Sequence, residues 1–169
     1  MPKHDAITLL KADHAAVKKL FAQEQKATKQ SDEKKQSIFD QINDALTVHA
    51  AIEEEIFYPA VKKAREEHLK DEVREAYEEH QQVKNLLAKI SNISPDDESW
   101  DMKIKVLKED VEHHVKEEES EMFPDAKKFL GEKRLNELGA ELQARKQELK
   151  KNPPTKLIRN QQEAFSAAK

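Results

Sequence analysis

The chain has 169 residues, of which 38% are charged and only two are glycine, and its formal net charge is −4 at pH 7. This length suits one domain with a buried core, and the charge argues for long solvent-exposed helices and against a nucleic-acid-binding protein. The absence of cysteine excludes disulfides and iron–sulfur clusters, and without an apolar membrane span or signal-peptide core we expect a cytoplasmic protein with no membrane contact.

Apolar residues recur at helical spacing along most of the chain. They predict four long helices, over residues 4–28, 32–65, 70–91 and 95–130. Ser31 is expected to cap the second helix, and a turn over 66–69 to reverse the chain before the third. Ser94 followed by Pro95 predicts the start of the fourth helix, because serine favours the capping position and proline the first helical position.

Gly131 is predicted to end the fourth helix. Beyond it a narrower apolar stripe predicts a fifth helix, which docks on the other four or pairs with a second copy in a homodimer. The stripe consists of Leu135, Leu138, Leu142 and Leu149. The predicted fold is all-α, an up-down-up-down four-helix bundle with an extra C-terminal helix. We expect a bundle over 1–131, the additional helix over 132–151 and a flexible tail over 152–169.

The two halves of the chain repeat one pattern of histidine, glutamate and proline. The paired positions are His14 with His80, His49 with His114, Glu53 with Glu118, and Pro59 with Pro124, at offsets of 65 or 66 residues. On a helix, residues four apart project from one face, so each half carries a histidine and a glutamate side by side. Each proline is predicted to kink or loosen its helix, because it lacks a backbone donor.

All four repeated histidines lie on the apolar stripes of their helices. Burying four imidazoles and two carboxylates is costly unless they bind one another or a cation. A buried hydrogen-bond network is the alternative, but it does not require the repeat. Imidazole and carboxylate donors suit iron, manganese or zinc. The spacing therefore predicts a metal site in which two glutamates bridge two ions and each ion receives two histidines.

These residues resemble the hemerythrin-like, HHE cation-binding family, in which helices one and three each carry a histidine and helices two and four each carry His-x-x-x-Glu. The match covers about 10–130. The resemblance implies these ligands: His14, His49, Glu53, His80, His114 and Glu118. It implies two non-haem iron ions with an oxo or hydroxo bridge, with zinc and manganese as alternatives.

The sequence departs from the oxygen carriers of that family at two positions. Carriers have a second histidine on helix three and an aspartate after the helix-four histidine, where this chain has Lys84 and Glu119. Reversible oxygen carriage is therefore not expected. We expect a protein that binds or reacts with oxygen, peroxide or nitric oxide, or that senses or holds iron, and turnover stays open. The alternatives are an iron donor that repairs iron centres under nitrosative stress, and a non-catalytic interaction bundle with a zinc or structural site.

Three further side chains could add a ligand. His113 is predicted to be half-exposed, because counting ten residues back from Pro124 selects His114 instead. Tyr58 and Tyr77 are predicted to pack in the core with satisfied hydroxyl groups. Glu54 or Glu117 is expected to accept a hydrogen bond from a ligand histidine.

Overall fold

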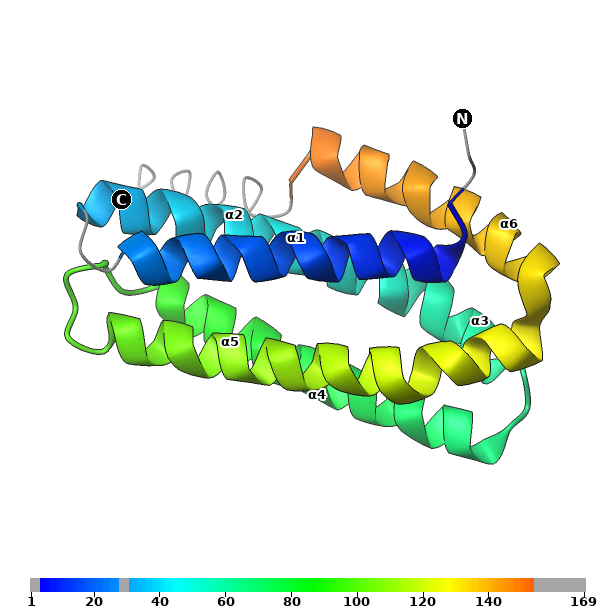
Figure 1. Ribbon diagram of the computed structural model, residues 1–169. Helices are drawn as coiled ribbons and strands as arrows, with labels where there is room; N and C mark the ends of the chain where they lie inside the picture. The colour runs from blue at the N-terminus through cyan, green and yellow to red at the C-terminus, as the bar shows by residue number, and fades with distance from the viewer. Residues whose placement is uncertain (1–3, 28–30, 154–169) are drawn as a thin grey trace, which may run out of the picture.

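The computed structural model describes residues 4–27 and 31–153, which form helices joined by short turns with no strand among them (Figure 1). The elements are α1 (Ala6–Ala27), α2 (Asp32–Ile52), η1 (Glu53–Phe57), α3 (Tyr58–Lys62), α4 (Glu67–Ser91), α5 (Trp100–Glu117), η2 (Glu118–Met122) and α6 (Phe123–Lys151). The predicted all-helical fold is confirmed. The predicted tail falls mostly on residues 154–169, outside the described residues.

Four helical rods lie side by side, and successive rods run in opposite directions (Figure 1). The first rod is α1 and the third is α4. The second joins α2, η1 and α3 without a break, and the fourth joins α5, η2 and the beginning of α6. Gly131 then adopts φ 75° and ψ 165°, a backbone conformation that favours glycine, and turns the chain within α6. The rest of α6 runs back along α1 and α2.

The helix starts follow the capping signals only in part. The predicted cap is confirmed at α2, where the Ser31 side chain accepts a hydrogen bond from the backbone N–H of Lys34 at 3.3 Å. The predicted start at Pro95 is wrong, because α5 begins five residues later. The Asp97 carboxylate accepts the backbone N–H of Ser99 at 2.8 Å, which holds this segment in turns until Trp100.

The reversal between the second and third rods also comes earlier than predicted. It occupies residues 63–66, ahead of the expected 66–69, and α4 begins at Glu67. Arg65 has a φ of 62°, the left-handed conformation with which helices commonly end. Such a conformation leaves no strong sequence signal when the residue is not glycine.

Each proline follows a π-helical turn. In η1 the backbone N–H of Tyr58 bonds to the carbonyl of Glu53, five residues back, and in η2 Phe123 bonds to Glu118 in the same way. The prediction that the prolines loosen their helices is therefore confirmed, and the loosening takes the form of a wider turn. Both turns begin at the glutamates of the repeat, and π-turns are frequent at functional sites.

Two apolar clusters fill the bundle. One occupies the end formed by the start of α1, η1, α3, the start of α4 and η2, and the other occupies the opposite end. Along each rod, the repeated histidine separates the residues of the first cluster from those of the second. The polar side chains thus form one layer between two apolar cores, where water is scarce and unpaired charge is costly.

The second part of α6 belongs to the first of these clusters. Leu135, Leu138 and Leu142 are buried in it, and Leu149 packs against it. The leucine stripe is thus covered within the chain, and a homodimer through this helix stays a prediction. Among the described helices, none has both the length and the apolar character needed to span a bilayer.

Candidate metal centre

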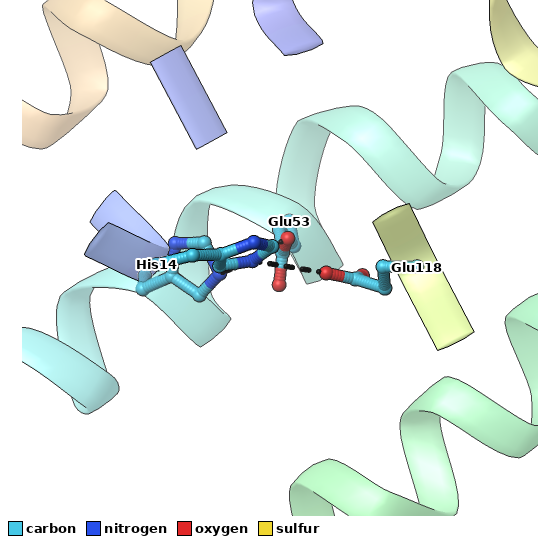
Figure 2. A group of neighbouring side chains, drawn as sticks. His14, Glu53 and Glu118 are labelled. Atoms are coloured by element: carbon cyan, nitrogen blue, oxygen red, sulfur yellow. Dashed lines mark hydrogen bonds and ion pairs between the residues drawn. The ribbon is translucent and has the colours of Figure 1, made fainter. Parts of the chain in front are cut away.

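The four repeated histidines and the two repeated glutamates meet in the layer between the two cores. Each is at least nine-tenths buried. Figure 2 shows His14, Glu53 and Glu118 pointing toward one another from α1, η1 and η2. The structure therefore brings the six repeated histidines and glutamates together in one place.

One half of the centre joins the first and second rods. His14 Nε2 lies 3.1 Å from His49 Nε2. Glu53 Oε1 lies 3.2 Å from His49 Nε2, and Glu118 Oε2 lies 3.2 Å from His14 Nε2. These two nitrogens and two oxygens lie within 4.8 Å of one another, which is close enough to surround one cation.

The other half joins the third and fourth rods with the same two glutamates. His80 Nε2 lies 3.0 Å from His114 Nε2. Glu53 Oε2 lies 3.3 Å from His80 Nε2, and Glu118 Oε1 lies 3.5 Å from His114 Nε2. Each carboxylate thus presents one oxygen to each half, the arrangement that two bridging carboxylates require.

Each histidine is oriented by a carboxylate on its outer nitrogen. The Nδ1 atoms pair as follows: His14 with Glu119 at 2.8 Å, His49 with Asp13 at 3.3 Å, His80 with Glu54 at 2.9 Å, and His114 with Glu79 at 2.6 Å. An ionised carboxylate only accepts hydrogen bonds, so each Nδ1 carries the hydrogen and each Nε2 faces the centre. Such outer partners fix the ring orientation and raise the basicity of metal-binding histidines.

The inner atoms fit a cation. Two imidazole nitrogens approach to 3.0–3.1 Å only when a proton or a metal ion lies between them. Glu53 Oε1 and Glu118 Oε2 are buried and accept no hydrogen bond. Orphaned oxygens of this kind are costly in a dry interior. Nitrogen and oxygen donors without sulfur suit iron, manganese and zinc.

The pKa values show how strongly the centre attracts positive charge. Burial lowers the pKa of His49, but the charge of Glu53 and the hydrogen bond to Asp13 outweigh it and raise that pKa to about 10. Burial also lowers the pKa of His80, but the hydrogen bonds to Glu53 and Glu54 outweigh it and raise that pKa to about 9. Burial alone would raise the pKa of Glu53, but the charge of His49 outweighs it and holds that pKa well below its usual range. A metal ion must therefore displace protons from the imidazoles.

The repeat is broken at one position inside the centre. Tyr58 donates its hydroxyl hydrogen to Glu118 Oε1 at 2.6 Å, and its oxygen lies 3.1 Å from His80 Nε2. Burial and the charges of Glu53 and Glu118 raise the pKa of Tyr58, so the hydroxyl keeps its hydrogen. The equivalent residue, Phe123, stacks on His14 at 5.7 Å. Of these two equivalent positions, the one beside His80 therefore has a hydroxyl group and the one beside His14 does not.

Two lysines neutralise outer carboxylates. Lys84 Nζ contacts both oxygens of Glu54, at 2.7 and 2.8 Å, and so faces away from the centre. Lys146, on the returning part of α6, contacts Asp13. Each half of the centre thus has one histidine whose outer carboxylate is paired with a lysine.

A small cavity touches all four imidazoles. Its volume is about 30 Å³, and its remaining walls are mostly apolar side chains such as Val17, Leu46, Val83, Leu87 and Val111. This space holds one or two water-sized molecules. The centre therefore has room for a small ligand but not for a large one.

The outer partners were predicted only in part from the sequence. Glu54 has the expected role, but Glu117 bonds to the exposed His113 at 3.0 Å and not to a histidine of the centre. His113 is directed outward, with 63% of its side chain exposed. Sequence reasoning missed three outer partners, namely Asp13, Glu79 and Glu119. The repeat itself was the available signal, because Asp13 pairs with Glu79 and Glu54 with Glu119 at the same offsets.

Comparisons with known proteins agree with this geometry. The family model of the Hemerythrin HHE cation binding domain matches residues 5–126. A DNA nickase from Nostoc sp. is 31% identical over 141 residues, which are 83% of this chain but 39% of that protein. The chain thus spans about two fifths of the length of the nickase. An uncharacterized protein of Mycobacterium tuberculosis is 27% identical over 150 residues, covering 88% of this chain and 89% of that protein.

A solved structure has the same fold. It is the crystal structure of a hemerythrin HHE cation binding domain-containing protein from Mycobacterium kansasii, with a TM-score of 0.74 and 24% sequence identity. The alignment covers 92% of this chain and 98% of that one. The likeness therefore extends over most of the chain.

Proposed function

This chain belongs to the hemerythrin HHE cation-binding family, and from that premise we propose that it is a non-haem di-iron protein that binds or reacts with oxygen, peroxide or nitric oxide. The proposed ligands are His14, His49, Glu53, His80, His114 and Glu118. In this proposal the protein is one of the family members that react with their ligand, and not one of the reversible oxygen carriers.

The two-sided placement of the glutamates carries this proposal. Each of Glu53 and Glu118 spans both halves, and each half adds two inward-facing imidazole nitrogens. A site for one ion would not need both oxygens of both carboxylates at such spacing. Two ions, one for each pair of histidines, would be held by these imidazole nitrogens and by both oxygens of each carboxylate.

Iron bound there would supply redox-active ions with open positions for a small ligand. The chain's own residues restrict what arrives and how it is held. The cavity of about 30 Å³ admits molecules the size of oxygen, peroxide or nitric oxide. The Tyr58 hydroxyl lies beside His80 Nε2, and its hydrogen, donated to Glu118 in the metal-free protein, would become available to a small ligand if metal ions took up the Glu118 oxygens. The four outer carboxylates keep the imidazoles aimed inward.

Lys84 supports a role other than reversible oxygen carriage. The resemblance places a ligand histidine of the carriers at this position. Here the ammonium group binds Glu54, so it adds no ligand to the centre. The half with His80 and His114 is therefore poorer in protein ligands than a carrier and keeps more open positions for a reactant.

Elemental analysis of the untagged protein tests the proposal, together with visible spectra of the reduced and re-oxygenated forms. We expect two irons per chain and a ferric absorption band that disappears on reduction. The variant His114→Ala should lose at least one metal, whereas His113→Ala, which changes the neighbouring exposed histidine, should retain both. Zinc alone, no metal, or equal metal content in the two variants would contradict the proposal.

A further inference from the structure

A small pocket on the outer side of α4 and η2 is lined by carboxylates. Its volume is about 50 Å³. The acidic residues around it are Glu72, Glu75, Glu79, Glu117, Glu118 and Glu121. No basic side chain is among the described residues that line it. A concave surface with charge of a single sign concentrates ions of the opposite sign.

The pocket ends at the proposed metal centre. Glu118, which forms part of its wall, is 1% exposed and belongs to both halves of the centre. Its Oε2 atom is buried, accepts no hydrogen bond and lies 3.2 Å from His14 Nε2 inside the centre. Glu79, another wall residue, holds the outer nitrogen of His114. A cation that enters this pocket therefore meets a side chain of the centre directly.

Two groups of potential ligands flank the pocket. On one side His68, Glu72 and Asp125 bring their ligand atoms within 4.8 Å of one another, and on the other side Glu79, His113 and Glu117 do the same. These groups are partly exposed, so they would hold a cation only weakly. Burial and the charges of Asp125, Glu121 and Glu75 raise the pKa of Glu72, as expected where negative charges gather.

A second and larger opening near the centre carries charges of both signs. This groove of about 850 Å³ between α1 and α5 also reaches His14, and Lys11, Lys18 and Lys116 line it together with Glu112 and Glu119. Its walls are otherwise mainly apolar, including Val17, Phe21, Val111 and Val115. Lysine ammonium groups repel an approaching divalent ion. The two openings therefore differ in the charge of the molecules that they favour.

We propose that divalent metal ions reach the buried centre through the acidic pocket between α4 and η2, with Glu75 and Glu121 attracting them at its mouth and Glu118 receiving them at its inner end. This inference rests on the proposed function, since it concerns the loading of the same centre.

The rate of metal uptake by metal-free protein tests the route. Co²⁺ is the probe, because its visible absorption reports binding after rapid mixing. The variant Glu75→Gln with Glu121→Gln removes two exposed charges at the mouth. The matched control, Glu109→Gln with Glu112→Gln, removes two exposed charges from α5, one of them in the lysine-lined groove. At low ionic strength we expect uptake to slow about five- to tenfold in the first variant and less than twofold in the control.

The final amount of bound metal should be unchanged in both variants, because neither residue pair contacts the inner atoms. The difference between the variants should shrink at roughly 0.5 M salt, where charges are screened within a few ångströms. Equal rates in the two variants, or slowing in the control alone, would overturn the route while leaving the metal centre intact. Failure of the unaltered protein to bind Co²⁺ at all would instead overturn the proposed function, and the route with it.

Discussion

Replacing Tyr58 by phenylalanine isolates the hydroxyl group that breaks the repeat. The residue is fully buried, and its hydroxyl donates to Glu118 at 2.6 Å. A hydrogen bond to a charged group contributes about 1.5–3 kcal/mol, and a short buried bond belongs in the upper part of that range. We therefore expect the free energy of unfolding of the metal-free protein to fall by about 2–3 kcal/mol. For a chain of this size, Tm should fall by roughly 4–12 °C.

The metal-loaded protein should respond less to Tyr58→Phe. When cations bind the oxygens of Glu118, the carboxylate no longer depends on the hydroxyl, so we expect a loss of about 1 kcal/mol or less. Urea unfolding measures both values, with the fluorescence of Trp100 as the probe. This is the single tryptophan of the chain, and it is fully buried.

The chain contains a matched control for this experiment. Tyr77, the other tyrosine, donates its hydroxyl hydrogen to the backbone carbonyl of Glu54 at 3.1 Å. Tyr77→Phe removes the same atom from a neutral bond, so it should cost about 0.5–1.5 kcal/mol with or without metal. The reasoning would be refuted if both variants lost the same stability, or if Tyr58→Phe cost more in the loaded protein than in the metal-free one.

Three further predictions concern the outer partners, the protons and the packing of α6. Glu79→Ala removes the 2.6 Å partner of His114 and should weaken metal binding about 10- to 100-fold in chelator competition; unchanged affinity would contradict its role. Because the pKa values of His80 and His49 are raised to about 9 and 10, their protons stabilise the metal-free fold below about pH 6.5, and this stability is lost as the pH rises through those values. The urea concentration that unfolds half of the metal-free protein should therefore decrease as the pH is raised from 8 to 10. For the metal-loaded protein it should stay constant, and the same decrease in both forms would contradict this prediction. Gly139→Ala, which normally stabilises a helix by about 1 kcal/mol, should instead lower Tm, because the new methyl group would collide with the backbone just before α1; a higher Tm would show that α6 does not pack there.

The sequence predicted the gathering of the six ligand candidates because their positions follow helical geometry. A histidine and a glutamate four residues apart share a face whatever the details of packing, and the repeat sets both pairs at one level. The all-helical class followed for the same reason, since the apolar spacing is continuous over long stretches. These features depend on periodicity, which a single sequence displays directly.

Other features depend on contacts between distant residues and could not be read in this way. The start of α5 at Trp100 depends on the Asp97 turn and on packing of the tryptophan ring against Phe39 at 5.4 Å. Tyr58 enters the centre because η1 is wound as a π-turn, which shifts every later side chain around the helix. Proline signalled a disturbance at this point but not its form.

The internal repeat makes the two halves of the chain depend on each other. Neither half of the chain contains the complete surroundings of either histidine pair, because Glu118 from the second half contacts His14 and Glu53 from the first half contacts His80. The outer carboxylates cross in the same way, with Glu119 on His14 and Glu54 on His80. Each histidine pair of the centre therefore uses carboxylates from both halves of the chain. Tyr58 and Phe123, which occupy equivalent positions, give the two pairs different surroundings.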